Sequence, residues 1–402
     1  MSGFLDRSLP PHIVTLVVAT AVSALATNVF LPSLPGIARH FEADYAVAQL
    51  TVSVYLAATA LLQLAIGPAS DRFGRRPVML ACLVIFVFGT LVAIWAPTIE
   101  VLLAARVLQS FSAAGMVLAR AIVRDTVDTD EAASRIGYIT MGMALVPMVA
   151  PTVGGVLDEI HGWQASFALM LAFGVLALGL VHFDLGETNR NPSASMMAQV
   201  RTYPQLFGSR LFWGYNLTAA LATGAFFVFI GAGPFVATEL LGLRPFEFGL
   251  CSGLLSLGYV VGNFLSARYS RRAGLNRMML AGNLVTVFGI VLALALFAAG
   301  ARHALALFGP LMLLGVGNGM TLPNANAGIV SVRPHLAGSA SGLGGSLQLG
   351  MSAVLSSVAG VVVTQQTGVN AMLYLMLACG LLAVAATLSV MYAMLGKAER
   401  ND

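Results

Sequence analysis

The sequence predicts an all-α membrane protein with twelve transmembrane helices arranged in two six-helix bundles. Three observations lead to this fold class. Of the 402 residues, 58% are hydrophobic and only 9% are charged, whereas a soluble domain carries about 25% charged residues. Apolar runs of about 20 residues, long enough to cross a bilayer as helices, recur along the chain. The longest polar break between them lies near the middle of the chain.

The apolar runs define twelve spans and two halves. We expect an N-terminal bundle at 1–183, a cytoplasmic linker at 184–209 and a C-terminal bundle at 210–402. The expected spans are 12–34, 47–67, 78–96, 98–120, 134–157, 163–183, 210–235, 247–267, 277–299, 303–325, 337–363 and 370–395.

The two halves also resemble each other. The stretch "VMLACLVIFVFGTLVA" at 78–93 aligns with "MMLAGNLVTVFGIVLA" at 278–293, an offset of 200 residues that is close to half the chain. Together with six spans on each side of the linker, this duplication predicts two parallel bundles. Such bundles are typical of transporters that rock around a site at the membrane midplane.

The distribution of basic residues predicts the orientation. If the N-terminus is cytoplasmic, 17 of the 21 Lys and Arg residues fall on the cytoplasmic side. The opposite side holds only Arg39, Arg244 and Arg302, and Arg106 lies inside a span. Because cytoplasmic loops are enriched in Lys and Arg, both termini are expected in the cytoplasm.

The loop "GPASDRFGRRP" at 67–77 links the second and third spans. Gly67 and Pro68 are expected to end a helix, and Gly74 permits a tight turn. One interpretation is a positive cluster that merely keeps the loop inside, and the other is a gate built from the single acid among three arginines. The gating candidates here are Gly67, Asp71, Arg72, Gly74, Arg75 and Arg76.

A second group of gating candidates lies in the fifth span. Pro147 and Pro151 remove two backbone donors, so the helix should bend there. Gly154 and Gly155 permit close helix contact. Ordinary use of Gly and Pro in membrane helices is the alternative.

Arg106 lies about 12 Å from the outer end of the fourth span, at 1.5 Å per residue. Asn28 and Tyr55 are expected at the same depth. An intramembrane charge indicates a functional site, and we expect Arg106 to face a cavity. The alternative is that Arg106 only ties helices together through backbone carbonyls. The expected substrate-binding residues are Asn28, Tyr55, Arg106, Gln109, Tyr138 and Met141 in the first half, and Asn216, Phe226, Phe229 and Gln348 in the second.

Several motifs resemble one known family. The loop "GPASDRFGRRP", "RVLQSF" at 106–111, "ARAIVRD" at 119–125, "VAPTVGGVL" at 149–157 and "GET" at 186–188 resemble the major facilitator superfamily. Within it they are similar to the Bcr/CflA subfamily, named for bicyclomycin and chloramphenicol/florfenicol resistance. The resemblance implies the major facilitator fold, a cytoplasmic charge network formed by the loop, and a drug/proton antiporter.

The sequence departs from that pattern at one position. The family usually has Asp in the first span where this chain has Asn28, and all 17 acidic residues fall in loops or at helix ends. An arginine does not release its proton at physiological pH. The sequence therefore offers no intramembrane carboxylate as proton carrier.

These features favour a multidrug or antibiotic efflux transporter of the bacterial inner membrane that works by alternating access. We expect a monomer that handles neutral or anionic small molecules, possesses no cofactor or metal, and binds no nucleic acid. Exchange against protons is what the resemblance implies. A facilitator or importer of a small organic anion is the alternative, and no motif indicates an enzyme.

The orientation can be tested with fusions of alkaline phosphatase, which is active only outside the cytoplasm. A fusion after Gly162 should be active, and fusions after Arg76 or Pro192 should be silent, because the basic segments stay inside. The reverse pattern of enzyme activity would overturn the orientation.

Overall fold

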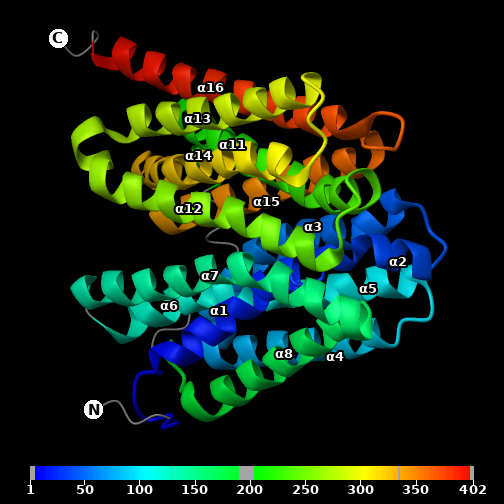
Figure 1. Cartoon of the computed structure of the whole chain (residues 1–402). Helices are drawn as coiled ribbons and strands as arrows, with labels where there is room; N and C mark the ends of the chain where they lie inside the picture. The colour runs from blue at the N-terminus through cyan, green and yellow to red at the C-terminus, as the bar shows by residue number, and fades with distance from the viewer. Residues whose placement is uncertain (1–4, 128, 190–202, 334–335, 399–402) are drawn as a thin grey trace. The chain divides into compact units, whose positions relative to one another are not determined.

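The computed structural model describes residues 5–127, 129–189, 203–333 and 336–398, and these ranges fold into helices and turns without any strand (Figure 1). Twelve of its helical segments are long and apolar enough to cross a membrane, which confirms the predicted fold class. The chain divides into two compact units, Met1–Val200 and Arg201–Asp402. Residues 190–202 of the expected linker, including Pro192, lie outside the described residues.

The first unit contains six spans built from eight α-helices. They are α1 (Ile13–Asn28), α2 (Leu34–His40), α3 (Tyr45–Phe73), α4 (Arg75–Ile94), α5 (Ile99–Gln109), α6 (Ala113–Thr126), α7 (Thr129–His161) and α8 (Gln164–Asp184).

Two of these spans are interrupted in a way that hydrophobicity does not predict. The 3₁₀ turn Leu31–Ser33 separates α1 from α2, and the 3₁₀ turn Ser110–Ser112 separates α5 from α6. The expectation that Gly67 and Pro68 end a helix is wrong, because α3 continues through Pro68 to Phe73. Membrane helices tolerate an internal proline where neighbouring groups compensate the lost backbone bond. Gly74 then makes the turn with φ 99°, as expected.

The second unit repeats the arrangement of six spans. Its helices are α10 (Tyr203–Phe207), α11 (Arg210–Phe235), α12 (Pro245–Ala273), α13 (Leu275–Ala298), α14 (Ala304–Ser331), α15 (Ala337–Val362) and α16 (Gly368–Ala398). A π-helical turn, Val236–Leu240, extends α11. Helix α14 packs mainly against α12 and α13, and α11 packs mainly against α15 and α16.

A buried carboxylate anchors the N-terminal end of the first unit. Asp184, the last residue of α8, has no exposed surface and accepts hydrogen bonds from three groups. These are the backbone N–H of Leu5 at 3.0 Å, the backbone N–H of His12 at 2.8 Å and the hydroxyl of Thr15 at 2.6 Å. Because a negative charge is favourable at a helix N-terminus, Asp184 fixes the start of α1 on the end of α8.

Small residues let helices approach closely in both units. A Cβ at Gly154 in α7 would overlap the carbonyl oxygen of Val29, and a Cβ at Gly115 in α6 would overlap that of Ala19. In the second unit Gly258 and Gly315 play the same part between α12 and α14. The close contact expected at Gly154 is therefore confirmed, and it is the packing mode that membrane helices use in the absence of a hydrophobic drive.

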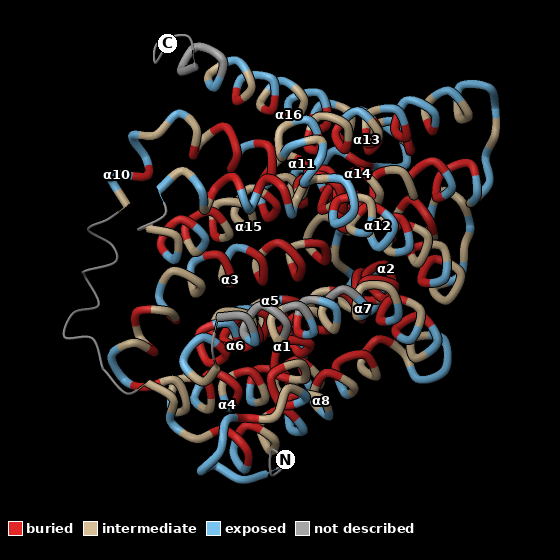
Figure 2. The backbone as a smooth tube through the Cα atoms, turned by 90° about the vertical axis from the view of Figure 1, so that its left-hand side faces the viewer, coloured by how far each residue is buried: buried red, intermediate tan, exposed pale blue. Residues whose placement is uncertain are grey.

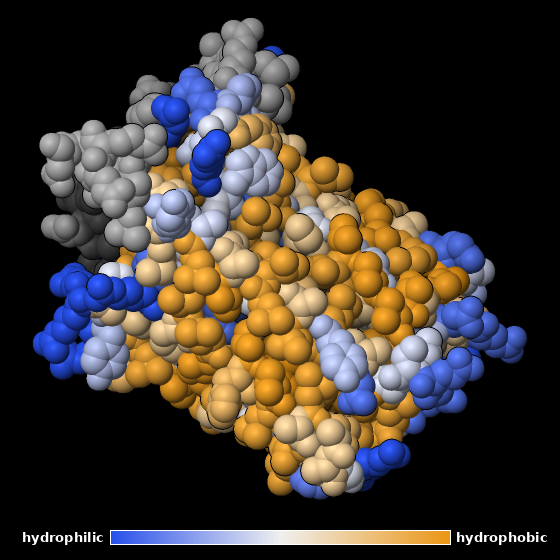
Figure 3. Space-filling view, turned by 90° about the horizontal axis from the view of Figure 1, so that it is seen from above, coloured by the Kyte–Doolittle hydropathy of each residue, from blue (hydrophilic) through white to orange (hydrophobic). Residues whose placement is uncertain are grey.

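Burial and hydropathy distinguish the central helices from the helix faces that are exposed. In Figure 2 the buried colour follows much of α1 and α11, which each present buried residues on most sides. Large apolar side chains such as Trp95, Phe264 and Tyr392 are exposed. One face of the molecule carries a broad hydrophobic surface, with hydrophilic residues gathered toward its edges (Figure 3). This pattern is expected for helices whose outer faces contact lipid.

The close approach at Gly154 makes a direct prediction about stability. Gly154→Ala should lower the melting temperature in detergent, because overpacking a tight contact costs about 1–3 kcal/mol. Gly179→Ala in α8 is the matched control, since no heavy atom lies within 4 Å of a Cβ there. Equal melting temperatures for the two variants would show that α1 and α7 do not need this contact.

Candidate functional site

Arg106 lies in the last turn of α5 and has no exposed surface. Its guanidinium donates three hydrogen bonds. Nε donates to the carbonyl oxygen of Thr51 in α3 at 2.8 Å, one terminal nitrogen donates to the carbonyl oxygen of Ala26 in α1 at 2.9 Å, and the other donates to Oε1 of Gln109 at 2.6 Å. Arg106 therefore connects three helices through their backbones.

Two aromatic rings enclose the same guanidinium. The Cζ atom of Arg106 lies 4.4 Å from the ring centroid of Phe30 and 4.4 Å from that of Tyr55. Such cation–π contacts contribute about 2 kcal/mol or more when the pair is desolvated. They help to compensate the loss of water around the charge, which would otherwise cost several kcal/mol.

Tyr55 and Gln109 extend this cluster to further helices. The hydroxyl of Tyr55 lies 3.0 Å from Oγ of Ser23 in α1 and 2.9 Å from Oγ of Ser112 in the turn before α6. The amide nitrogen of Gln109 donates to Oγ1 of Thr90 in α4 at 3.0 Å. We call Arg106, Gln109, Tyr55 and Phe30 the Arg106 cluster. Its polar contacts connect α1, α3, α4 and α5.

The structure brings some of the expected site residues together and leaves others apart. Arg106, Tyr55 and Gln109 meet as expected, whereas Asn28 donates its amide to Ala24 in its own helix at 2.8 Å. Tyr138 and Met141 in α7 are 58% and 56% exposed. The cluster is packed between helices and presents no open surface at Arg106. Its contacts favour the role of a tie between helices over direct exposure to a cavity.

The candidates in the second unit also differ in their surroundings. Phe229 is buried in a cluster with Phe248 and Phe308, at ring-centroid distances of 6.2 and 5.9 Å, so it is part of the core. Phe226 and Gln348 are partly exposed. Asn216 is buried, and its Oδ1 has no hydrogen-bond partner. Buried carbonyl oxygens are usually hydrogen-bonded, so Asn216 offers an acceptor that could bind a donor of a ligand.

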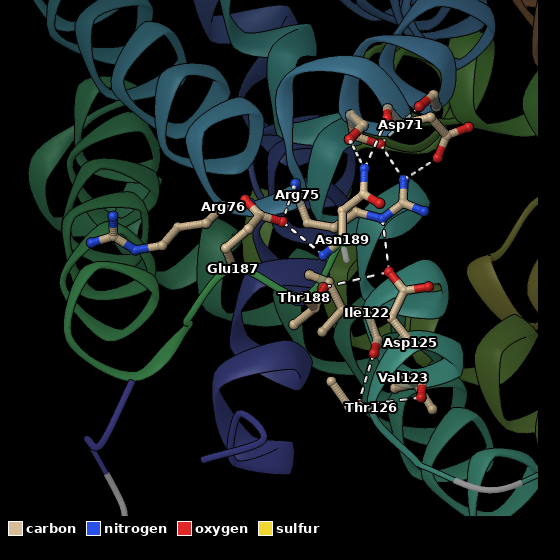
Figure 4. A network of polar contacts seen from close by, with 12 residues as sticks. Asp71, Arg75, Arg76, Ile122, Val123, Asp125, Thr126, Glu187, Thr188 and Asn189 are labelled. Carbon is tan, nitrogen blue, oxygen red and sulfur yellow. Dashed lines mark hydrogen bonds and ion pairs between the residues drawn. The ribbon is translucent and has the colours of Figure 1, made fainter. Parts of the chain in front are cut away.

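The gating candidates form a second polar site at the end of the first unit that carries the α3–α4 turn (Figure 4). Arg75 is the centre of this network, and only 11% of its side chain is exposed. It donates to Oδ1 of Asp71 at 2.5 Å, to Oγ of Ser70 at 2.6 Å and, through Nε, to Oδ2 of Asp125 at 3.0 Å. One arginine thus pairs with carboxylates from the end of α3 and the end of α6.

The segment after α8 joins the same network. Oε1 of Glu187 accepts from the backbone N–H of Arg75 at 2.9 Å, and the amide of Asn189 donates to the carbonyl oxygen of Asp71 at 2.8 Å. Asp125, Glu187 and Asn189 were not predicted as functional residues. Two of them lie in the quoted motifs "ARAIVRD" and "GET", but no spacing in the sequence indicates that these motifs meet the α3–α4 turn.

The side chains of the other gating candidates do not contact Arg75, Asp71 or Asp125 in the described network. Arg72 places its guanidinium 5.4 Å from the ring of Phe73, and Arg76 donates to the carbonyl oxygen of His182 at 3.3 Å. Helix α7 runs continuously through Pro147 and Pro151, so the expected bend remains a prediction. Gly67 lies within α3 and Gly155 within α7. In the part of the chain that the structure describes, no group of three or more His, Cys, Asp or Glu side chains is placed to hold a metal.

Comparison with known proteins decides the family. The family model of the Major Facilitator Superfamily matches residues 16–355 and 232–400. This chain is a member of the major facilitator superfamily. It is 29% identical over 382 residues to multidrug resistance protein D of Escherichia coli, covering 92% of this chain and 93% of the relative. It is 28% identical over 386 residues to a bicyclomycin resistance protein homolog of Haemophilus influenzae, covering 93% and 94%.

These relatives place this superfamily member in the Bcr/CflA subfamily, as the motifs indicated. The crystal structure of a human organic anion transporter has the same fold. The TM-score is 0.71 at 18% sequence identity, over 94% of this chain and 98% of that one. The chain is thus a multi-pass membrane transporter.

The contacts of Arg106 predict the effect of replacing it. Arg106→Lys should lower the melting temperature in detergent, because a lysine cannot bond three acceptors in one plane between two rings. We expect a loss of about 2–4 kcal/mol of stability. The matched control is Arg72→Lys, which keeps a charge near Phe73 and should be neutral. If Arg106→Lys keeps its stability but loses drug binding, Arg106 holds the substrate and is not a tie.

Proposed function

We propose that this transporter exports drugs or antibiotics across the bacterial inner membrane by alternating access, driven by an ion gradient. The observation that supports this most directly is the similarity to two relatives named for multidrug and bicyclomycin resistance over more than nine-tenths of the chain. In alternating access the two six-helix units rock around the substrate.

The substrates we propose are neutral or anionic. The three hydrogen-bond acceptors of Arg106 are two backbone carbonyls and one amide, so none of them carries a negative charge. Its positive charge is therefore not neutralised by these partners, and in a low-dielectric region it repels cations over a long range. Acidic residues, which would attract cationic drugs, are confined to loops and helix ends.

We assign the structural role and the contact with substrate to two different sets of residues. The Arg106 cluster fixes the helices of the first unit and sets the positive field. Direct substrate contacts are assigned to candidates that keep exposed surface, namely Tyr138, Met141, Phe226 and Gln348, with Asn28 and Asn216 as polar partners. Aromatic and thioether side chains suit structurally varied drugs, because they adapt to different apolar shapes.

The proposed export predicts an outcome in energised cells that lack their own pumps. Cells with this transporter should retain less of a neutral or anionic labelled antibiotic than cells with an empty vector, and a protonophore should abolish the difference. Ethidium, a cation, should be retained equally. Uptake of the label above the vector level would indicate an importer and overturn export, and efficient export of ethidium would overturn the charge preference.

The same assay tests the substrate-contacting residues. Tyr138→Ala should raise KM several-fold, because a lost aromatic contact is worth about 0.5–1.5 kcal/mol. The matched control is Tyr374→Ala in α16, where the tyrosine is equally exposed at 60% but is not assigned to substrate. Similar KM values for the two variants would remove Tyr138 from the site.

A further inference from the structure

The segment Gly186–Asn189 begins two residues after the end of α8, and its Glu187 and Asn189 bond to the two helices that flank the α3–α4 turn (Figure 4). The two carboxylate oxygens of Glu187 accept from the backbone N–H groups of Arg75 at 2.9 Å and Arg76 at 3.3 Å. The amide of Asn189 donates to the carbonyl oxygens of Asp71 at 2.8 Å and Ser70 at 3.4 Å. One short segment therefore contacts the end of α3 and the start of α4.

These bonds supply what the two helix ends lack. The first N–H groups and the last C=O groups of a helix have no partner within the helix. Helix α4 begins after Gly74, which has no side chain to cap it. The carboxylate of Glu187 replaces the missing cap and is favoured there by the helix dipole. The hydroxyl of Thr188 also donates to a carboxylate oxygen of Asp125 at 3.4 Å, so the same segment contacts the end of α6.

Among the residues that the structure describes, no neighbour occupies the corresponding place at the turn between α12 and α13. Gly274, between α12 and α13, has φ 84° and ψ 153°, close to the φ 99° and ψ 151° of Gly74. No heavy atom lies within 4 Å of a Cβ at Gly274, whereas a Cβ at Gly74 would overlap the carboxylate of Glu187. The same backbone geometry thus occurs in the second unit without a carboxylate at this place, so the cap by Glu187 is an addition to the turn and not a condition of its geometry.

We propose that Gly186–Asn189 form a clasp that attaches the start of the linker to the Arg75 network, with Glu187 as its positioning residue. This inference rests on the proposed alternating access, in which the network at this end of the first unit must rearrange in each cycle. The clasp sets how readily the Arg75 network rearranges. Asp71 lies 16 residues beyond Tyr55, about 24 Å along α3 at 1.5 Å per residue, so the clasp acts on turnover and not on substrate binding.

The first test measures hydrogen exchange of backbone amides in the purified full-length protein and requires no transport. The amides of Arg75 and Arg76 should exchange about five- to tenfold faster in Glu187→Gln than in the unaltered protein, because a charge-assisted hydrogen bond is lost. The amides of Leu275 and Asn276 at the start of α13 are the internal control and should not change. Unchanged exchange at Arg75 and Arg76 would overturn the clasp, whatever the protein transports.

The second test measures transport kinetics. Glu187→Gln should lower the maximal rate about three- to fivefold with KM unchanged, as expected for a residue that does not contact substrate. Glu131→Gln is the matched control, since it breaks only the exposed pair with Arg135 in α7 and should leave the rate unchanged.

A double variant distinguishes the clasp from an unrelated surface effect. If Glu187 and Asp71 act on one network, Glu187→Gln combined with Asp71→Asn should lose less than the product of the single losses. A changed KM in Glu187→Gln, or fully multiplicative losses, would overturn the assignment. Absence of transport by the unaltered protein would instead contradict the proposed function and leave the exchange result to decide on the clasp.

Discussion

Burying a permanent positive charge is the constraint on which the first unit depends. Lipid offers no hydrogen-bond partners, so Arg106 donates its hydrogen bonds to acceptors of the protein itself. Carbonyl oxygens of Thr51 and Ala26 accept two of its hydrogen bonds, and these residues belong to α3 and α1. The cost of desolvating one guanidinium is thus met by contacts between three helices. Moving any of these helices relative to the others would leave a charged donor unsatisfied, which makes this part of the unit rigid.

The carboxylates of the first unit lie at the ends of helices, whereas Arg106 lies inside a span. Asp184 holds the start of α1, and Glu187 caps the start of α4. Asp71 and Asp125 pair with Arg75 at the ends of α3 and α6. Each acid therefore stabilises the boundary of a span. Asp71, Asp125 and Glu187 keep exposed surface there, whereas the buried Asp184 is compensated by its three hydrogen bonds. The centre of the unit is thus tied by a buried arginine, whereas the network at its end consists of ion pairs that keep some exposed surface.

The sequence predicts the spans well, because hydrophobicity over about 20 residues is a local property. It also predicts the turn at Gly74 and the proximity of Arg106 to Tyr55 and Gln109, which follow from helical geometry and depth. It does not predict the 3₁₀ turn after Gln109, the continuation of α3 past Pro68, or the role of Glu187. Each of these depends on contacts between residues that are distant in the sequence. Phe229 shows the same limit, because the sequence of a span does not distinguish an aromatic residue that faces a ligand from one that faces the core.

The internal duplication shows which features the two units can change independently. At the offset of 200, Gly274 repeats the backbone of Gly74, but Asp71 and Arg75 correspond to Arg271 and Leu275. The second unit ties its helices with neutral groups: Asn283 donates to Thr387 at 3.0 Å and accepts from Thr321 at 3.3 Å. Neutral amides and hydroxyls cost far less to bury than a guanidinium. The buried charge of Arg106 and the Arg75 network both belong to the first unit, so the two units stabilise a similar arrangement of helices with different chemistry.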